Sequence, residues 1–285
     1  MDSRTAGSMF RSYLRLFRLG NCLMGAIGTL LAVIVCVGIT DLSKYALEAV
    51  LSMLVVILFT AAGNALNDYY DRETDKRAHP ERPIPSGKLT PHEVVYSSVA
   101  LFTLAFITSV AVTILSVAIV ATSIVVILAY ELRLKAEGIV GNLAIAWLTG
   151  ALFLFGGAAV DRLNIAWILA ALAFLATLGR EITKDIQDIE GDRASRRTLP
   201  MRIGERRASY VAAASFFAAV VLSPLPYIQD LLSIWYVPAV AVADGIFIYC
   251  ALILFQSPGR GQKIAKLAMA VALAAFLLGG VLKWM

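Results

Sequence analysis

Long apolar stretches alternate with short polar segments along this chain, and that alternation constrains its fold more than any single motif. Nine stretches approach the length of about 20 mostly apolar residues that one helix needs to cross a bilayer. They lie at 19–39, 46–68, 91–110, 113–131, 142–160, 164–187, 207–224, 232–255 and 264–284. Hydrophobic residues make up 59% of the chain, against about 45–50% in ordinary soluble proteins. The sequence therefore predicts an all-α polytopic membrane protein with nine transmembrane helices, and eight is the main alternative count.

Lysine and arginine residues gather on one side of this predicted topology. When successive loops alternate between the two sides, 22 of the 25 basic residues fall on the side of the N-terminus. The other side receives only Lys44, Arg162 and Lys283. Because loops rich in Lys and Arg stay in the cytoplasm, we expect a multi-pass protein of the cell membrane. Its N-terminus and the loops after the second, fourth, sixth and eighth helices are predicted to be cytoplasmic.

Two acidic segments with the same spacing stand at the predicted cytoplasmic ends of the second and sixth helices. The first acidic motif is Asp68, Asp71 and Asp75, and the second acidic motif is Asp185, Asp188 and Asp192. Each aspartate of the second motif follows its counterpart by 117 positions. The same offset relates Glu73 to Glu190, Pro83 to Pro200 and Gly87 to Gly204. Six matches without a gap favour an internal repeat over a chance alignment.

The repeat predicts how one transmembrane domain, 1–285, is built. Its two halves are pseudo-repeats of four helices each, at about 15–131 and 139–255, and a final helix follows at about 264–284. Membrane proteins are often assembled from such duplicated units. The two acidic motifs then occupy equivalent places in the two halves.

Helical spacing brings the acidic side chains together. Asn64 precedes the first acidic motif by one turn and Glu181 precedes the second, so each set is expected on one face of one helix. Two carboxylates ~5 Å apart repel by roughly 3 kcal/mol at an effective dielectric constant near 20. A cation must compensate, and Mg²⁺ fits best because it prefers carboxylate and phosphate oxygens. The alternative is that these are solvated helix ends paired with neighbouring arginines.

Basic residues flank both motifs and are candidates for binding phosphate oxygens, which arginine can grip with paired donors. They are Arg72, Arg82, Arg133, Lys135 and Lys184. Arg72, between two aspartates, and Lys135, beyond Tyr130, are the strongest of them. The alternative role for each is to fix the topology at anionic headgroups.

The run from Asn67 to Asp75 resembles the NDxxDxxxD motif of the UbiA superfamily of intramembrane prenyltransferases. The run from Asp185 to Asp192 resembles the second aspartate motif of that superfamily. The resemblance covers nearly the whole chain. It implies nine transmembrane helices in a bundle, with a cap over a central cavity on the cytoplasmic side.

The resemblance also implies a chemistry. The segments 79–87 and 180–185 are most similar to the branch that alkylates geranylgeranylglyceryl phosphate in ether-lipid synthesis. The implied reaction moves a geranylgeranyl group from its diphosphate to the acceptor's hydroxyl. It involves membrane lipid and neither nucleic acid nor a protein partner. The implied Mg²⁺ ligands are Asn67 and the six aspartates of the two motifs.

Two alternative functions remain open. An aromatic acceptor such as 4-hydroxybenzoate would keep the mechanism but alkylate carbon. A transporter is disfavoured because transport sites lie near the bilayer midplane, whereas the ionisable residues here collect at helix ends. Asp244, inside the eighth predicted helix, is the exception.

Further substrate contacts follow from the same resemblance. Asn64, Asn67, Tyr130, Arg18 and Asn21 are the candidates. The family's YxxxK loop motif is lengthened here by one residue, so either Arg133 or Lys135 can serve as its lysine. Small residues at 156–159 and 212–214 either line a slot for the isoprenyl chain or allow close helix packing.

Overall fold

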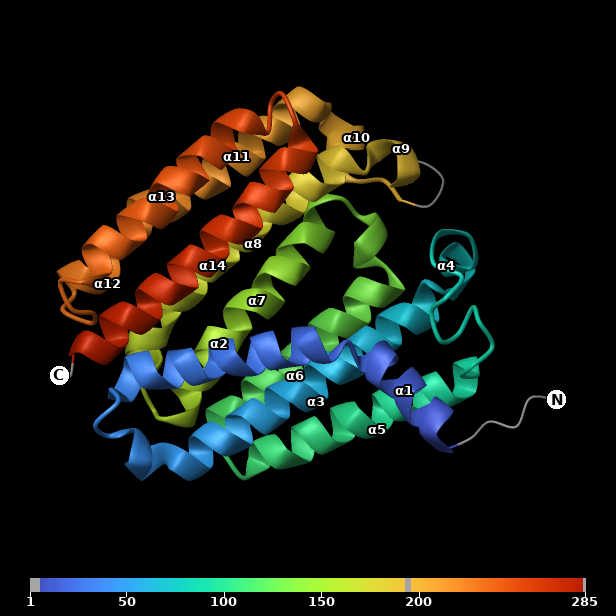
Figure 1. Cartoon of the computed structure of the whole chain (residues 1–285), viewed down its shortest axis with the longest axis horizontal. Helices are drawn as coiled ribbons and strands as arrows, with labels where there is room; N and C mark the ends of the chain where they lie inside the picture. Colours follow the sequence, from blue (N-terminus) through green and yellow to red (C-terminus); the bar gives the residue numbers. More distant parts are fainter. Residues whose placement is uncertain (1–5, 193–195, 284–285) are drawn as a thin grey trace.

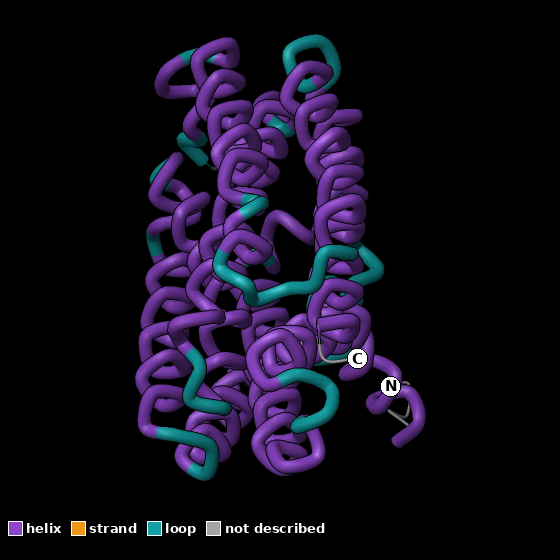
Figure 2. The backbone as a smooth tube through the Cα atoms, turned by 90° about the vertical axis from the view of Figure 1, so that its left-hand side faces the viewer, coloured by secondary structure: helices purple, strands orange, loops and turns teal. Residues whose placement is uncertain are grey.

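The computed structural model describes residues 6–192 and 196–283, and all its regular elements there are helices (Figure 2). The long helices are α2 (Leu19–Val37), α3 (Ala46–Tyr70), α5 (Pro91–Val110), α6 (Ile114–Leu132), α7 (Ile139–Ala159), α8 (Leu163–Gln187), α11 (Glu205–Leu222), α13 (Tyr236–Ile253) and α14 (Pro258–Lys283). The short ones are α1 (Ala6–Phe17), η1 (Leu42–Tyr45), α4 (Arg72–Ala78), η2 (Leu134–Ala136), α9 (Ile189–Asp192), α10 (Leu199–Ile203) and α12 (Leu225–Ile228).

The prediction of nine transmembrane helices is confirmed for the described residues. Nine helical segments there are long and apolar enough to cross a membrane. Large apolar side chains point outward from them; Val125, Val221 and Leu252 are between 61% and 74% exposed. Apolar surface of this kind is stable against lipid and unfavourable in water. The chain is therefore a multi-pass membrane protein.

Local sequence sets where several of these helices begin. Thr90 and Glu93 form a reciprocal capping box at the start of α5, and Pro91 occupies the first helical position. Thr113 caps α6 by accepting a hydrogen bond from the Ser116 amide. Such caps satisfy backbone donors that have no partner inside the helix. They allow a tight turn to join the end of α5 at Val110 to the start of α6 at Ile114.

The nine long helices close into a ring. Each packs against the next one along the chain, and α14 packs against α2 as well as α13. In Figure 1 the N-terminal helices α2, α3, α5 and α6 form one side, the C-terminal helices α11, α13 and α14 form the other, and α7 and α8 run between them. The short helices α4, α9 and α10 all lie at the same end of the molecule (Figure 1).

The two halves have matching local geometry around the acidic motifs. α3 and α8 are both 25 residues long, and both bounds of α8 lie 117 positions after those of α3. Gly87 and Gly204 both have positive φ, 71° and 88°, a conformation that favours glycine. These matches support the internal repeat. The exact boundaries at 15–131 and 139–255 stay a prediction.

Small residues on α7 serve close helix packing. A Cβ atom on Gly156 would lie 2.7 Å from the Cβ atom of Ala32 and 2.8 Å from the carbonyl oxygen of Thr29. A Cβ atom on Gly157 would collide with Ala166 on α8. Residues 156–159 are buried between these helices. Of the two interpretations of this segment, packing is therefore the correct one.

Replacing Gly157 with alanine is expected to destabilise the protein by about 1–3 kcal/mol, the usual penalty for overpacking a tight contact. Thermal unfolding in detergent measures the effect. The control is Gly245→Ala on α13, where an added Cβ meets no atom within 4 Å, and its unfolding temperature should match that of the wild type. Equal unfolding temperatures for the two variants would contradict the packing role.

Asp244 makes a polar contact within the C-terminal half. Its Oδ2 accepts a hydrogen bond of 2.6 Å from the Ser223 hydroxyl, and the Tyr236 hydroxyl donates to the carbonyl oxygen of Ser223. The contact joins α13 to the end of α11. This contact explains why an acidic residue lies inside a membrane helix, and no transport site is needed to explain it.

Candidate active site

The first acidic motif spans a break between two helices. α3 ends at Tyr70, Asp71 caps it with φ −83° and ψ 0°, and α4 begins at Arg72. The predicted single column of acidic side chains on one helix is therefore wrong in part. Asp68 and Asp75 share a basic partner, Arg82, whereas Asp71 binds a different segment of the chain. Asp71 is thus bound by a different basic residue from Asp68 and Asp75.

Arginine residues neutralise Asp68 and Asp75, which are both only 4% exposed. Arg82 donates a hydrogen bond of 2.6 Å to Asp75 Oδ2 and lies 3.6 Å from Asp68 Oδ1. Arg18 donates to Asp68 Oδ1 from the junction of α1 and α2. Its backbone is left-handed, with φ 50° and ψ 63°, a conformation that costs a non-glycine residue about 1–2 kcal/mol. This turn brings the Arg18 side chain back over α3.

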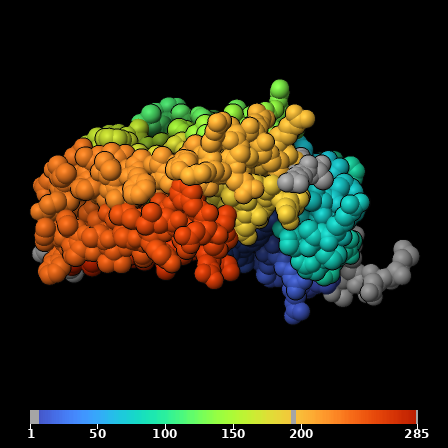
Figure 3. Space-filling model, turned by 90° about the horizontal axis from the view of Figure 1, so that it is seen from above, coloured from blue at the N-terminus to red at the C-terminus, as the bar shows by residue number. Residues whose placement is uncertain are grey.

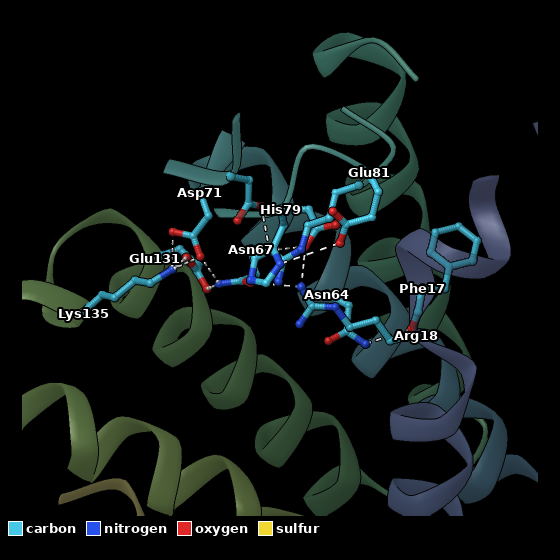
Figure 4. Close-up of polar contacts among 12 residues, drawn as sticks. Phe17, Arg18, Asn64, Asn67, Asp71, His79, Glu81, Glu131 and Lys135 are labelled. Carbon is cyan, nitrogen blue, oxygen red and sulfur yellow. Dashed lines mark hydrogen bonds and ion pairs between the residues drawn. The ribbon is translucent and has the colours of Figure 1, made fainter. Parts of the chain in front are cut away.

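Lys135 neutralises Asp71. The 3₁₀ turn η2 directs its ammonium group to both oxygens of Asp71, each at 2.7 Å, and to Glu131 at 3.2 Å (Figure 4). The same nitrogen lies 6.0 Å from the ring centroid of Tyr130. The Arg133 side chain is 82% exposed and pairs with Glu137 instead. Of these two residues, Lys135 therefore contacts the first acidic motif and Arg133 contacts Glu137.

Glu131 is a site residue that the sequence did not single out. Its side chain is only 1% exposed, and it accepts hydrogen bonds from Asn67 Nδ2 at 3.0 Å and from Lys135. Asn67 Nδ2 also donates to Asp71 Oδ2 at 3.1 Å. The sequence did contain one signal for Glu131. It is a carboxylate at the end of a predicted transmembrane helix, four residues before Lys135.

Three predicted substrate contacts have other partners or lie apart from this network. Asn64 donates 2.8 Å to the carbonyl oxygen of Phe17 and so fixes the junction of α1 and α2. Arg72 lies over the Tyr69 ring and donates to the Tyr69 carbonyl oxygen. Asn21 is exposed on α2.

The second acidic motif repeats the helix break. Asp185 lies in the last turn of α8, Asp188 caps that helix, and α9 follows. The Asn142 side chain at the start of α7 donates 2.9 Å to Asp185 Oδ2. Lys184 lies beside Asp185 and is partly buried. The side chain of Asp192 lies outside the described part of the structure.

Asn142 is a second residue that the sequence did not assign to the site. It is 7% exposed and follows Gly141, as Asn21 follows Gly20 in the first half. The repeat contained this signal, because the counterpart of Asn142 was already a candidate substrate contact. Among the described contacts, Asn142 bonds to an aspartate of a motif and Asn21 does not.

The loop after α6 connects the surroundings of the two motifs. The Arg197 amide donates to the carbonyl oxygen of Ala136 at 3.4 Å, and the Arg202 guanidinium donates to the Glu137 carboxylate at 3.0 Å. Seen from above, the segment around α4 and the segment around α10 lie at the same end of the molecule (Figure 3). The two motifs are thus part of one region at one end of the helix ring.

Charge compensation at the first motif differs from the expectation. The sequence argument favoured a divalent cation over pairing with neighbouring basic residues, but Arg18, Arg82 and Lys135 already pair with the three carboxylates. Within residues 6–192 and 196–283, no three acidic, histidine or cysteine side chains converge into a ready-made metal site. The donor set still fits Mg²⁺, because it consists of carboxylate oxygens and an amide oxygen. A metal would have to displace the basic groups from these oxygens.

Comparison with known proteins identifies the family. The sequence profile of the UbiA prenyltransferase family matches residues 18–281. The chain belongs to the UbiA prenyltransferase family. Digeranylgeranylglyceryl phosphate synthase of Methanosarcina mazei is 39% identical over 286 residues, which cover 94% of this chain and 98% of that protein. This UbiA family member is accordingly a membrane-embedded prenyltransferase.

Solved structures of the UbiA family share the fold. A structure of digeranylgeranylglyceryl phosphate synthase has a TM-score of 0.84 and 33% identity, and the match covers 96% of this chain and 99% of that one. A UbiA homologue from Archaeoglobus fulgidus, bound to GPP and Mg²⁺, has a TM-score of 0.66 and 19% identity over 93% of this chain and 99% of its own. The helix ring is therefore the fold of this family.

Proposed function

We propose that this chain transfers a geranylgeranyl group from geranylgeranyl diphosphate to the free hydroxyl of geranylgeranylglyceryl phosphate. The observation that carries the proposal is the pair of acidic motifs at equivalent helix ends, which lie at the same end of the helix ring (Figure 1). Relatives named digeranylgeranylglyceryl phosphate synthase, 35–40% identical over nearly the whole chain, support the choice of acceptor. The substrates are thus an isoprenyl diphosphate and a lipid-soluble acceptor.

The binding residues follow from the geometry. Asn67 and the aspartates of both motifs, Asp192 included, would hold Mg²⁺. Bound there, the metal would neutralise negative charge on the departing diphosphate. Arg18, Arg82 and Lys135 already point at the first motif, and they exchange carboxylate oxygens for phosphate oxygens when the diphosphate binds. Arg72 and Lys184 stand next to the motifs as further phosphate contacts.

The reaction consists of one bond broken and one bond formed. The bond between C1 and the diphosphate oxygen breaks, and the diphosphate leaves with the electron pair. The acceptor's hydroxyl oxygen then bonds to the allylic C1 and gives its proton to a carboxylate of the site. A site closed to water would keep water from capturing the allylic cation.

The proposed orientation places the site in the cytoplasm. Both motifs lie at the helix ends that carry most of the basic residues, and such ends face inward. At this end Arg202 of α10 donates a hydrogen bond of 3.0 Å to Glu137 of the loop that follows α6. That bond lowers the pKa of the Glu137 carboxyl below its ordinary value. The contact joins the loop that follows α6 to α10.

A product assay tests the function. Purified protein in detergent with Mg²⁺ and geranylgeranyl diphosphate is expected to alkylate geranylgeranylglyceryl phosphate at oxygen. A parallel reaction offers 4-hydroxybenzoate, and products are identified by mass spectrometry. Chelation of Mg²⁺ should stop product formation. Transfer only to the aromatic acceptor, or transfer that is insensitive to chelation, would contradict the proposal.

A further inference from the structure

We infer that Glu131 is a positioning residue for the first acidic motif: it orients the Asn67 amide and holds Lys135 against Asp71. Its role concerns the binding of magnesium with a diphosphate, so the inference rests on the proposed function and deepens it. Glu131 lies in the last turn of α6, away from both motifs in sequence. Its hydrogen bond to Asn67 links positions 64 residues apart.

The first step is the orientation of Asn67. The amide nitrogen has two hydrogens, and the structure gives it two acceptors, Glu131 at 3.0 Å and Asp71 at 3.1 Å. Both donors are thereby used on one side of the amide. The oxygen Oδ1 consequently faces the opposite side, where Arg18 approaches it at 3.5 Å next to Asp68 (Figure 4). Only the oxygen of an amide binds a metal ion, so this orientation decides whether Asn67 can act as a ligand.

The second step is the placement of Lys135. Its ammonium group donates to both oxygens of Asp71 and to Glu131, and it is only 12% exposed. Two carboxylates from different helices therefore fix one cation. When a diphosphate draws Lys135 away from Asp71, Glu131 remains as its anchor. The hydrogen bond to Glu131 thus restricts the ammonium group of a flexible lysine side chain to one position in the site.

The third step is the need for a carboxylate at position 131. Both oxygens of Glu131 accept, one from Asn67 and the other from Lys135. Glutamine has nearly the same shape but offers one oxygen and one NH₂ group. One of the two donors would then face another donor at about 3 Å, a typical hydrogen-bond distance. Either the Asn67 amide turns over or Lys135 leaves its position.

Glu131→Gln tests this role without any acceptor substrate. The probe is Mg²⁺ with inorganic pyrophosphate, and the measurement is the rise in unfolding temperature in detergent as pyrophosphate is titrated at fixed Mg²⁺. We expect the apparent affinity to fall about 10–100-fold, the usual effect of removing a group that orients a metal ligand. The KM for geranylgeranyl diphosphate should rise by a similar factor.

The matched control is Glu137→Gln, in the loop that follows α6, where the carboxylate pairs with Arg202 and Arg133 at the surface. Its pyrophosphate affinity should equal that of the wild type. Glu131→Gln should also have a smaller effect in a Lys135→Gln background, because residues that act through one partner are not additive. Should Glu131→Gln fail to fold, Glu131→Asp is titrated instead and is expected to bind pyrophosphate more weakly than the wild type.

A purely structural role would lower the unfolding temperature of Glu131→Gln while leaving its pyrophosphate affinity and the KM unchanged, and that result would overturn the inference. Independent, additive effects of Glu131 and Lys135 would overturn it as well. Failure of the proposed function has a different outcome. In that case the wild type binds magnesium pyrophosphate but forms no product with geranylgeranylglyceryl phosphate.

Discussion

Asp71→Asn and Asp188→Asn are each expected to lower the turnover number about 10²–10³-fold, the usual cost of removing one preorganised electrostatic contact from an active site. Both aspartates cap the helices that carry the motifs. Asparagine keeps the shape of the side chain, but it removes the negative charge and replaces one acceptor oxygen with an NH₂ donor. Initial rates of prenyl transfer in detergent, at saturating Mg²⁺ and geranylgeranyl diphosphate, measure the effect.

The matched control is Asp161→Asn, in the loop between α7 and α8. Asp161 has φ 56°, and asparagine is among the residues that tolerate this left-handed conformation best. The control loses the same charge at the opposite end of the helices, so its turnover should stay at the wild-type level. Near-normal turnover in both motif variants would remove the acidic motifs from the reaction.

Magnesium alone is expected to bind this protein weakly, and magnesium with pyrophosphate is expected to bind strongly. The oxygens that would hold the metal are occupied by the protein's own cations: Arg18 at Asp68, Arg82 at Asp75 and Lys135 at Asp71. A metal must displace these groups, and pyrophosphate provides them with new anionic partners. A ligand present at about 100 times its Kd stabilises a protein by about 2.7 kcal/mol. Unfolding temperatures with Mg²⁺ alone and with both components therefore separate the two cases.

Arg82→Gln tests the cause of this synergy. The substitution removes the guanidinium that binds Asp75 and lies near Asp68. Magnesium alone should therefore bind to the variant more tightly than to the wild type. Magnesium pyrophosphate should bind less tightly, because one phosphate contact is lost. Lys76→Gln is the control, since Lys76 is exposed on α4 and pairs only with Glu73 among the described contacts. An equal response of both variants to magnesium alone would refute the displacement model.

Most of the fold was accessible from local features of the sequence. The lengths of the apolar stretches predicted the nine long helices, and Thr90 and Thr113 mark the starts of α5 and α6. The spacing of the aspartates located both motifs at helix ends. The spacing of the aspartates did not predict that the helices break at Asp71 and Asp188. Over one or two turns, the same spacing fits a continuous helix and two helices that meet at a turn.

The sequence by itself determined that the chain crosses a membrane nine times and carries two acidic motifs, because hydrophobic length and residue spacing are properties of a single segment. Only the tertiary structure decided which cation neutralises each carboxylate. Arg18 reaches Asp68 across 50 positions, and Lys135 reaches Asp71 across 64. Such contacts depend on how the helices pack in the ring, so no local pattern reveals them. For the same reason, the choice of Lys135 over Arg133 and the contribution of Glu131 emerged only from the fold.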